Sequence, residues 1–168
     1  MEFGNATMSE PDLVKHAHVL TVSTRAATGV YPDTTGPQIA NWLAGHGFAV
    51  QTTIVPDRNV TIGIQTALAT GPRILITTGG TGLSPDDQTP QATAPFLTVK
   101  VPGVIEEIRR RGFAHTPNAL LTRGLCGLSG QTLVLNLPGT PGGVRDGLAV
   151  LDEILDHLLH QLSGGGHE

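Results

Sequence analysis

Short runs of Val, Ile, Leu and Thr alternate along the chain with longer stretches in which apolar residues recur at helical spacing. Short runs of this composition that end at Gly, Pro or polar residues are typical of buried strands. The pattern therefore predicts strands over residues 18–23, 48–55, 73–78 and 132–137.

The stretches between these strands predict helices. Residues 36–45 have a proline near their start and a glycine at their end, and residues 60–69 follow Asn59, a suitable N-cap. Residues 104–111 and 118–124 are also predicted to be helical. Residues 144–162 repeat leucine at helical spacing and predict an amphipathic C-terminal helix.

Strands that alternate with helices indicate an α/β fold of three layers, in which a mostly parallel sheet carries helices on both faces, as in Rossmann-like proteins. Ligands of such folds bind beyond the carboxyl ends of the strands. We therefore expect a site in the segments that follow the predicted strands: residues 23–36, 55–59, 77–93 and 136–143.

Length and composition set the outer limits. The 168 residues suit one domain, which we expect over residues 13–162, after a disordered leader at 1–12 and before a flexible tail at 163–168. The net charge of −4 and the lack of a Lys/Arg cluster argue against nucleic acid, and no apolar run predicts a membrane span. Cys126 is the single cysteine, so we expect it to be a buried apolar residue in a cytoplasmic protein.

A glycine-rich segment, Gly79, Gly80, Thr81 and Gly82, directly follows the third predicted strand. Closely spaced glycines let the backbone approach a ligand, and their N–H groups, with the hydroxyls of Thr78 and Thr81, suit a phosphate. The spacing matches neither the Walker A loop nor the dinucleotide-binding pattern. A purely structural turn remains the alternative.

Carboxylates accompany this segment. Asp86 and Asp87 follow the glycines, and Asp57 follows the second predicted strand at the same edge of the sheet. Carboxylates beside an anion site favour Mg²⁺, which takes carboxylate and phosphate oxygens together. The alternative is helix capping, because Asp87 and Thr89 both precede Pro90.

The string TTGGTGLSPDDQTPQAT, residues 77–93, resembles the signature of the molybdopterin-binding family of Mog/MoaB proteins and gephyrin-like G domains. The resemblance extends from about residue 18 to 162. Its other parts are VLTVSTRAATGVYPDTTG at 19–36, IVPD at 54–57, VPGVIEEIR at 101–109, LTR at 121–123 and NLPGTPGG at 136–143.

This resemblance implies a molybdopterin adenylyltransferase, which uses Mg²⁺ with ATP and molybdopterin as substrates. It also implies a homotrimer that hands its product to a molybdenum insertase. Asp57 and Asp87 match the positions implied for catalysis and for the metal. The positions implied to bind substrate are Ser23, Asp33, Thr78, Gly79, Gly80, Thr81, Gly82, Thr89, Glu106, Thr122, Arg123, Pro138, Gly139 and Pro141.

The chain departs from the family pattern at three positions. Thr24 stands where aspartate is common, Thr122 where serine is usual, and Gly142 where a lysine often follows the proline. Loss of that lysine removes a cation that could hold phosphate, although Arg145 lies three residues later. Two alternatives therefore remain: a molybdopterin-binding paralogue or scaffold without catalysis, and a nucleotide pyrophosphatase like the related competence-damage-type proteins.

Overall fold

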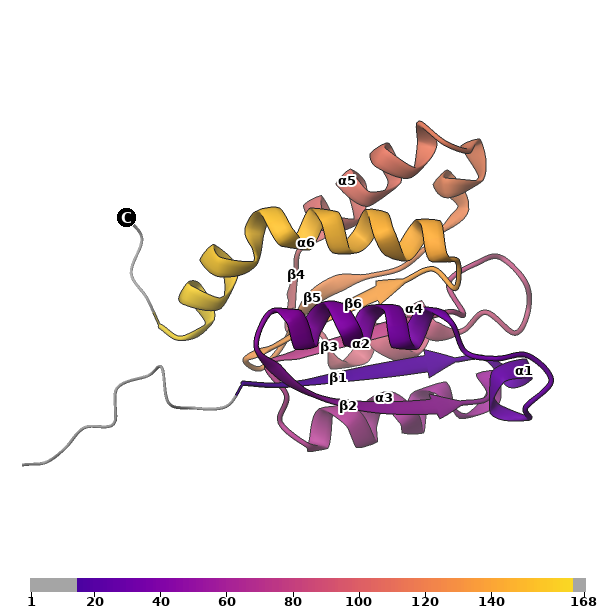
Figure 1. The fold of residues 1–168 in the computed structure, drawn as a ribbon, viewed down its shortest axis with the longest axis horizontal. Coiled ribbons are helices and arrows are strands. Elements are labelled where there is room, and N and C mark those ends of the chain that lie inside the picture. The colour runs from indigo at the N-terminus through magenta and orange to yellow at the C-terminus, as the bar shows by residue number, and fades with distance from the viewer. Residues whose placement is uncertain (1–14, 165–168) are drawn as a thin grey trace, which may run out of the picture.

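The computed structural model describes residues 15–164, which form a six-stranded sheet of order β2-β1-β3-β6-β5-β4 (Figure 1). Strands β1, β2, β3 and β6 are parallel, whereas β5 is antiparallel to β6 and β4 to β5. The strands are β1 Lys15–Val22, β2 Phe48–Val55, β3 Ile74–Thr78, β4 Val99–Lys100, β5 Cys126–Ser129 and β6 Thr132–Leu137.

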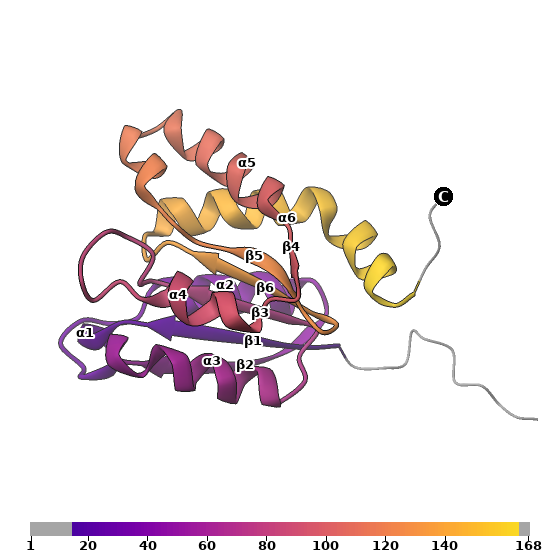
Figure 2. The same ribbon diagram turned by 180° about the vertical axis from the view of Figure 1, so that it is seen from behind.

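Helices cover both faces of this sheet (Figures 1 and 2). The α-helices are α1 Thr24–Ala27, α2 Thr35–Gly45, α3 Val60–Ala69, α4 Thr89–Thr93, α5 Pro102–Phe113 and α6 Pro141–Leu162. Short 3-10 helices span Asp57–Asn59, Ala94–Phe96 and Pro117–Leu121. The predicted three-layer α/β fold with a mostly parallel sheet is confirmed.

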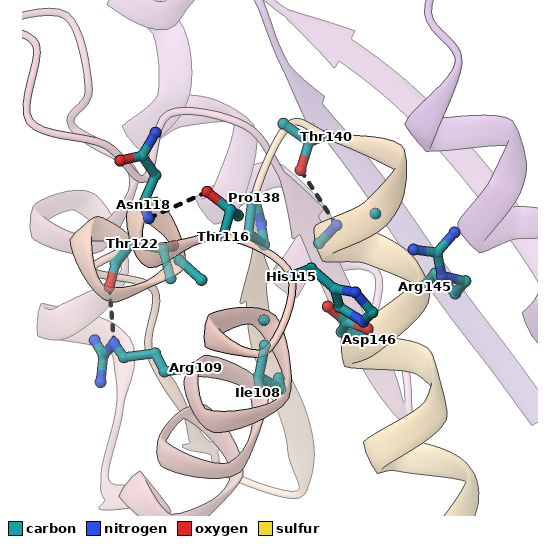
Figure 3. Close-up of a pocket in the computed structure, with 14 residues that line it drawn as sticks. Ile108, Arg109, His115, Thr116, Asn118, Thr122, Pro138, Thr140, Arg145 and Asp146 are labelled. Atoms are coloured by element: carbon teal, nitrogen blue, oxygen red, sulfur yellow. Dashed lines mark hydrogen bonds between the residues drawn. The ribbon is translucent and has the colours of Figure 1, made fainter.

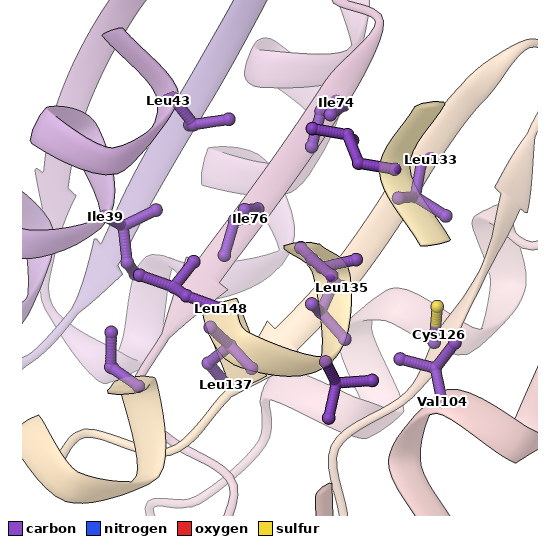
Figure 4. Packing of buried hydrophobic residues seen from close by; sticks show 14 of the residues in the cluster. Ile39, Leu43, Ile74, Ile76, Val104, Cys126, Leu133, Leu135, Leu137 and Leu148 are labelled. Carbon is purple, nitrogen blue, oxygen red and sulfur yellow. The ribbon is translucent and has the colours of Figure 1, made fainter. Parts of the chain in front are cut away.

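Alternation along the central strands builds a separate core on each face. Val19 and Ile76 face α2, α5 and α6, within the larger cluster shown in part in Figure 4. Their sequence neighbours Leu20 and Leu75 face the opposite way, against residues of α3 and α4. Because these strands are buried on both sides, they read as nearly continuous apolar runs.

Cys126 lies in the larger core and is 3% exposed, as the sequence predicts. Burial raises the pKa of its thiol to about 12, since the thiolate would lose its hydration there. The protonated thiol is therefore the form present at neutral pH, and it packs as a small apolar residue.

The predicted helix over residues 118–124 is present only as a 3-10 helix up to Leu121, and the prediction is wrong for residues 122–124. A 3-10 helix ends at Leu121, and Thr122 is extended, with φ −71° and ψ 132°. The N–H of Arg123 donates to Thr81 O at 2.9 Å, so a tertiary hydrogen bond replaces the one that an α-helix would make. Local pattern does not reveal such a partner, which lies about forty residues earlier in the chain.

The antiparallel strands β4 and β5, together with the short helices α1 and α4, are absent from the sequence-based prediction. Strand β4 has two residues and β5 has four, too few to show a period. Asn59 does precede α3, but its side chain makes no capping hydrogen bond. The expected leader at 1–12 lies outside the described residues, as do residues 165–168 of the expected tail.

Within residues 15–164, none of the helices combines the length and the apolar character that a membrane span needs.

Candidate phosphate-binding site

The carboxyl ends of the four parallel strands meet at one edge of the sheet. This rim consists of Ser23 and Thr24 after β1, Asp57 after β2, the loop from Gly79 after β3, and Pro138 to Thr140 after β6. The four segments that the strand pattern predicts to carry the site each follow one of these strands, whereas Glu106, Thr122 and Arg123 lie elsewhere in the chain. The parallel topology, rather than proximity in the chain, brings the four segments together.

The glycine loop needs its glycines for two reasons. Gly79 and Gly80 have φ of +95° and +68°, a region that side chains other than glycine rarely adopt. The loop also lies against its neighbours: a Cβ on Gly79 would collide with the carbonyl oxygen of Val22, and one on Gly80 with the hydroxyl of Thr89. The backbone is thus pressed onto the ends of β1 and α4.

Three of the N–H groups of this loop have no acceptor within the described protein. Gly79 N donates to Leu137 O at 3.0 Å, which ties the loop to β6. Within the described part of the chain, no backbone or side-chain acceptor receives the N–H of Gly80, Thr81 or Gly82. Successive N–H groups without protein acceptors form a concave anion site of the kind that binds phosphate.

The threonines around the loop hold it in place. Thr78 is fully buried, and its hydroxyl donates to Pro138 O at 2.8 Å, while that of Thr89 donates to Gly79 O at 2.9 Å. Thr81 accepts a hydrogen bond from Thr122, with 3.1 Å between the two hydroxyl oxygens. The structure therefore places Thr78 and Thr89 beneath the loop, where they support its backbone.

Arg123 fastens the far side of the loop. Its Nε donates to Gly82 O and its Nη2 to Asp87 O, both at 2.9 Å. Arg109 supports the same segment from α5, because its Nε donates to Thr122 O at 2.9 Å. The charge of Arg123 is thus held against two carbonyl oxygens of the loop.

Asp57 is oriented by Thr24. The Thr24 hydroxyl donates to Asp57 Oδ2 at 2.7 Å and accepts from Asp57 N at 3.1 Å, and Thr24 N donates to the same Oδ2 at 3.2 Å. In the hydrogen bonds of residues 15–164, Oδ1 of Asp57 has no partner. One carboxylate oxygen is thereby fixed and the other is left for a cation or a substrate.

Asp87 is held in the same way by its own turn. Its Oδ2 accepts from Ser84 N at 3.0 Å, and its N–H donates to Ser84 O at 2.9 Å. The capping alternative is wrong for this side chain, because the N-cap of α4 is Gln88 and makes no side-chain capping bond. Asp86, beside it, is exposed.

The oxygen donors suit Mg²⁺, which prefers carboxylate and phosphate oxygens. Among residues 15–164, no group of three Asp, Glu, His or Cys side chains is arranged to hold a metal ion alone. Asp57 and Asp87 are the rim carboxylates with the chemistry to bind such an ion, which would need further oxygen ligands from a bound molecule.

Ser23 and Asp33 have structural partners on the rim. Ser23 Oγ accepts from Ala26 N at 3.1 Å and caps α1. Asp33 accepts from Gly36 N at 3.0 Å and from the Thr21 hydroxyl at 2.9 Å, so it links the start of α2 to β1. Both side chains thus shape the β1–α2 part of the rim.

A pocket of about 370 Å³ opens beside the glycine loop, between the end of α5 and the start of α6 (Figure 3). Thr122 and Pro138 line it, together with Gly142 and Arg145. Gly139 borders the glycine loop, since a Cβ there would lie 3.4 Å from Gly79 Cα, and Pro141 O accepts from Gln38 Nε2 at 3.2 Å.

Glu106 stands apart from this group. It is exposed and lines a separate pocket of about 150 Å³ with Lys100 and Cys126, and Arg109 borders both pockets. The structure therefore brings together the rim residues and Thr122, Arg123 and Pro138, but it does not bring Glu106 to the glycine loop.

Sequence reasoning missed the central role of Asn136. Its side chain is 1% exposed, donates to the hydroxyls of Thr77 and Thr93 at 2.9 and 3.1 Å, and accepts from Leu125 N at 3.0 Å. A buried amide with all these bonds locks β3, β6 and α4 beneath the site. An asparagine inside an otherwise apolar strand is the signal that could have revealed it.

Comparison with known proteins decides the family. Residues 18–157 match the family described as "Probable molybdopterin binding domain". This chain belongs to that family. The glycine loop, the rim carboxylates and the α5–α6 pocket all lie within the matched residues, so the molybdopterin-binding domain family supplies the frame for interpreting them.

Three relatives illustrate the similarity. The molybdenum cofactor biosynthesis bifunctional protein of Synechococcus elongatus is 39% identical over 90% of this chain and 48% of its own length. The molybdopterin adenylyltransferase of Escherichia coli is 32% identical over 77% of this chain and 70% of its own. The Mog protein structure from Mycobacterium ulcerans is 46% identical, with a TM-score of 0.84 over 89% of this chain and 99% of that one.

The chain spans about half the length or less of several curated relatives that it matches, including two bifunctional proteins. It covers 21% of gephyrin from Dictyostelium discoideum. The similarity therefore concerns one domain of those larger proteins.

Proposed function

We propose that this protein acts in molybdenum cofactor biosynthesis by adenylylating molybdopterin with Mg²⁺ and ATP. One observation carries the proposal. The N–H groups of Gly80, Thr81 and Gly82, which have no acceptor among the described residues, lie on the same rim as Asp57 and Asp87. A sequence identity of 32% to the molybdopterin adenylyltransferase of Escherichia coli supports the same reaction.

In this reaction a phosphate oxygen of molybdopterin forms a bond to the α-phosphorus of ATP, and the bond from that phosphorus to the pyrophosphate oxygen breaks. Pyrophosphate leaves with the electron pair. The nucleophile is already an anion, so the protein needs no strong base. Its tasks are to position two polyanions and to reduce the repulsion between them.

The residues of the rim divide these tasks. The backbone N–H groups of the glycine loop bind phosphate oxygens, and Arg123 and the buried threonines keep that loop rigid. Asp57 and Asp87 would hold Mg²⁺, whose charge stabilises the pyrophosphate that departs. Thr24 fixes the direction of the Asp57 carboxylate.

Asp57→Asn and Asp87→Asn test this division. We expect each change to abolish adenylylation while affinity for molybdopterin stays within about twofold, because the carboxylates serve the metal and the nucleotide. Binding by fluorescence and turnover by chromatography of the product measure the two effects separately. Asp86→Asn, a change of the exposed neighbour, is the matched control and should leave both quantities unchanged.

Two other results would replace the proposal. Tight binding of molybdopterin without any ATP turnover would make the protein a binding paralogue, a reading that Gly142 in place of lysine keeps open. Hydrolysis of a dinucleotide in the absence of pterin would indicate a pyrophosphatase. Variants that lose affinity but turn over normally at saturation would contradict the roles assigned to the carboxylates.

The assembly and the cellular setting follow from the same proposal. We infer a cytoplasmic homotrimer that passes adenylylated molybdopterin to a molybdenum insertase. Relatives in which a similar domain forms about half of a bifunctional protein support such a transfer, because the next activity is then physically linked. Sedimentation equilibrium measures the number of 17.5 kDa chains in the assembly.

A further inference from the structure

The glycine loop carries little positive charge for a site that receives two polyanions. Between Gly79 and Thr89 the sequence contains Asp86 and Asp87 but no Lys or Arg. Arg123 reaches the loop, but its guanidinium donates to the carbonyl oxygens of Gly82 and Asp87. Arg123 keeps its charge in these bonds, but one cation balances only part of the charge of two polyanions, so a second cation from another element would contribute.

The α5–α6 pocket offers two arginines. Arg109 lies on α5, and its Nε is engaged by Thr122 O. Arg145 lies on the first turns of α6 and is exposed. Among residues 15–164, the ion pairs involve His46, Arg110 and Arg111, and no hydrogen bond to a protein acceptor is made by Arg145. Of the two arginines, Arg145 is the one whose guanidinium makes no hydrogen bond or ion pair within residues 15–164.

The guanidinium of Arg145 lies against the backbone of Gly142 at the start of α6. A Cβ at position 142 would be 3.6 Å from Arg145 Nη2, so the guanidinium lies directly beside this backbone. Gly142 therefore leaves this space to the arginine, whereas a long side chain at position 142 would have to share it.

The neighbouring carboxylate does not cancel this charge. Asp146 lines the same pocket, but consecutive residues of a helix do not face each other. Figure 3 shows Arg145 and Asp146 on different sides of α6. Pro138 lines the pocket, and its carbonyl oxygen accepts a hydrogen bond from the Thr78 hydroxyl. The pocket therefore adjoins the base of the glycine loop.

We propose that Arg145 is the phosphate-binding cation of the α5–α6 pocket and holds the terminal phosphate of molybdopterin. This inference rests on the proposed function for the identity of the substrate. It also assigns the two substrates to different ends of the rim. The magnesium-bound triphosphate of ATP lies near Asp57, beyond β2, and the phosphate of molybdopterin lies near Arg145, beyond β6.

Inorganic phosphate tests the site without any assumption about the substrate. Phosphate is titrated into the full-length protein, and the backbone amide shifts of residues 79–82 and 142–145 are followed by NMR. We expect Arg145→Gln to weaken phosphate binding about tenfold, because a charge-assisted contact is lost. Arg110→Gln removes the same charge outside the pocket and should have no effect. Unchanged phosphate affinity in Arg145→Gln would overturn the proposal.

A relocated cation provides the second test. In the background of Arg145→Ala, the change Gly142→Lys places an ammonium in the space that the guanidinium occupied. We expect the double variant to recover most of the lost phosphate affinity. Equal affinities in the single and the double variant, with both proteins folded by circular dichroism, would contradict a shared position for the two side chains.

Turnover separates this inference from the proposed function. If the protein adenylylates molybdopterin, Arg145→Gln should raise the KM for molybdopterin about tenfold and leave the KM for ATP unchanged. A rise in both KM values, or in neither, would overturn the assignment. If no adenylylation occurs in the wild type, the proposed function fails, and the phosphate titration alone decides whether Arg145 binds anions.

Discussion

At the scale of single residues, the pair of Thr24 and Asp57 shows how a departure from a family pattern can be accommodated. The Thr24 hydroxyl both donates to Asp57 Oδ2 and accepts from Asp57 N, so it fixes the carboxylate in two ways. An aspartate at position 24 would place a second negative charge there, whereas threonine leaves Asp57 as the carboxylate at this corner. Thr24 is therefore a positioning residue.

Thr24→Val keeps the shape of the side chain and removes both bonds of the hydroxyl. We expect kcat for adenylylation to fall about tenfold, the equivalent of ~1.4 kcal/mol in the barrier, while the KM for molybdopterin is unchanged. Steady-state kinetics with each substrate varied in turn measures this. Thr61→Val, on the exposed side of α3, is the control. A change confined to KM for molybdopterin would contradict the positioning role.

His18 is a second residue whose chemistry is set by its surroundings. His18 lies in β1 and is 2% exposed. Its Nε2 lies 2.9 Å from the Thr53 hydroxyl, and its Nδ1 is buried without a hydrogen-bond partner in the described residues. Burial lowers the pKa of this imidazole from 6.5, because the charged form loses its hydration. The folded protein therefore holds His18 neutral.

This arrangement predicts a loss of stability on acidification. Well above pH 6.5 His18 is neutral in both the folded and the unfolded state, and its contribution to the pH dependence vanishes. As the pH falls through 6.5, His18 binds a proton in the unfolded chain but stays neutral in the folded protein. The free energy of unfolding therefore falls, by at most ~1.4 kcal/mol per pH unit. Urea unfolding between pH 7.5 and 5.5 should show a smaller decrease in His18→Leu than in the wild type. Identical decreases in the two proteins would exclude His18 as the cause.

At the scale of elements, the glycine loop depends on both its backbone conformation and its close packing. Gly79 and Gly71 both have positive φ, of +95° and +67°, but a Cβ would meet the Val22 carbonyl oxygen only at Gly79, and open space at Gly71. Alanine at these two positions thus separates conformational strain from collision.

We expect Gly71→Ala to lower the free energy of unfolding by ~1 kcal/mol, the cost of the left-handed conformation alone. Gly79→Ala should cost clearly more, because the loop must also move away from β1, and it should abolish phosphate binding. Urea unfolding and phosphate titration measure the two effects. Equal losses of stability, with phosphate binding intact in Gly79→Ala, would show that the loop does not need this close approach.

The sequence predicts the elements that carry a clear period and misses those that long-range contacts create. The four parallel strands and the helices α2, α3, α5 and α6 are predicted within a few residues, because each buries a continuous apolar face. The segment after Leu121 is extended because Arg123 N binds Thr81 O, and β4 has two residues and only β5 beside it. Such partners are not visible in a local pattern.

The candidate site shows the same limit. The rim position of Asp57 and of the glycine loop follows from parallel strands ending at one edge, so spacing and topology suffice to predict it. The roles of individual side chains do not follow. Thr78 and Thr89 donate to backbone carbonyl oxygens, Asn136 organises the layer below the loop, and the guanidinium of Arg145 lies against the backbone of Gly142.

At the scale of the whole molecule, the layers of the fold give the rim its rigidity. Ion pairs join α5 to α6 through Arg111 and Glu153, with 2.7 Å between Nη2 and Oε2, and His46 of the α2 end lies 2.8 Å from Asp152 of α6. These contacts join helices of one layer, away from the strand ends that form the rim. The strand ends can then present a fixed set of N–H groups and carboxylates to substrates that repel each other.

If the protein transfers the adenylyl group of ATP to molybdopterin, the fate of a radioactive label in ATP reveals the transfer. The protein is incubated with molybdopterin, Mg²⁺ and ATP labelled at either the α- or the γ-phosphorus. We predict that the α-label appears in a pterin product and the γ-label in pyrophosphate, with neither transfer in Asp87→Asn. Release of the α-label as free nucleotide, without any labelled pterin, would contradict the account.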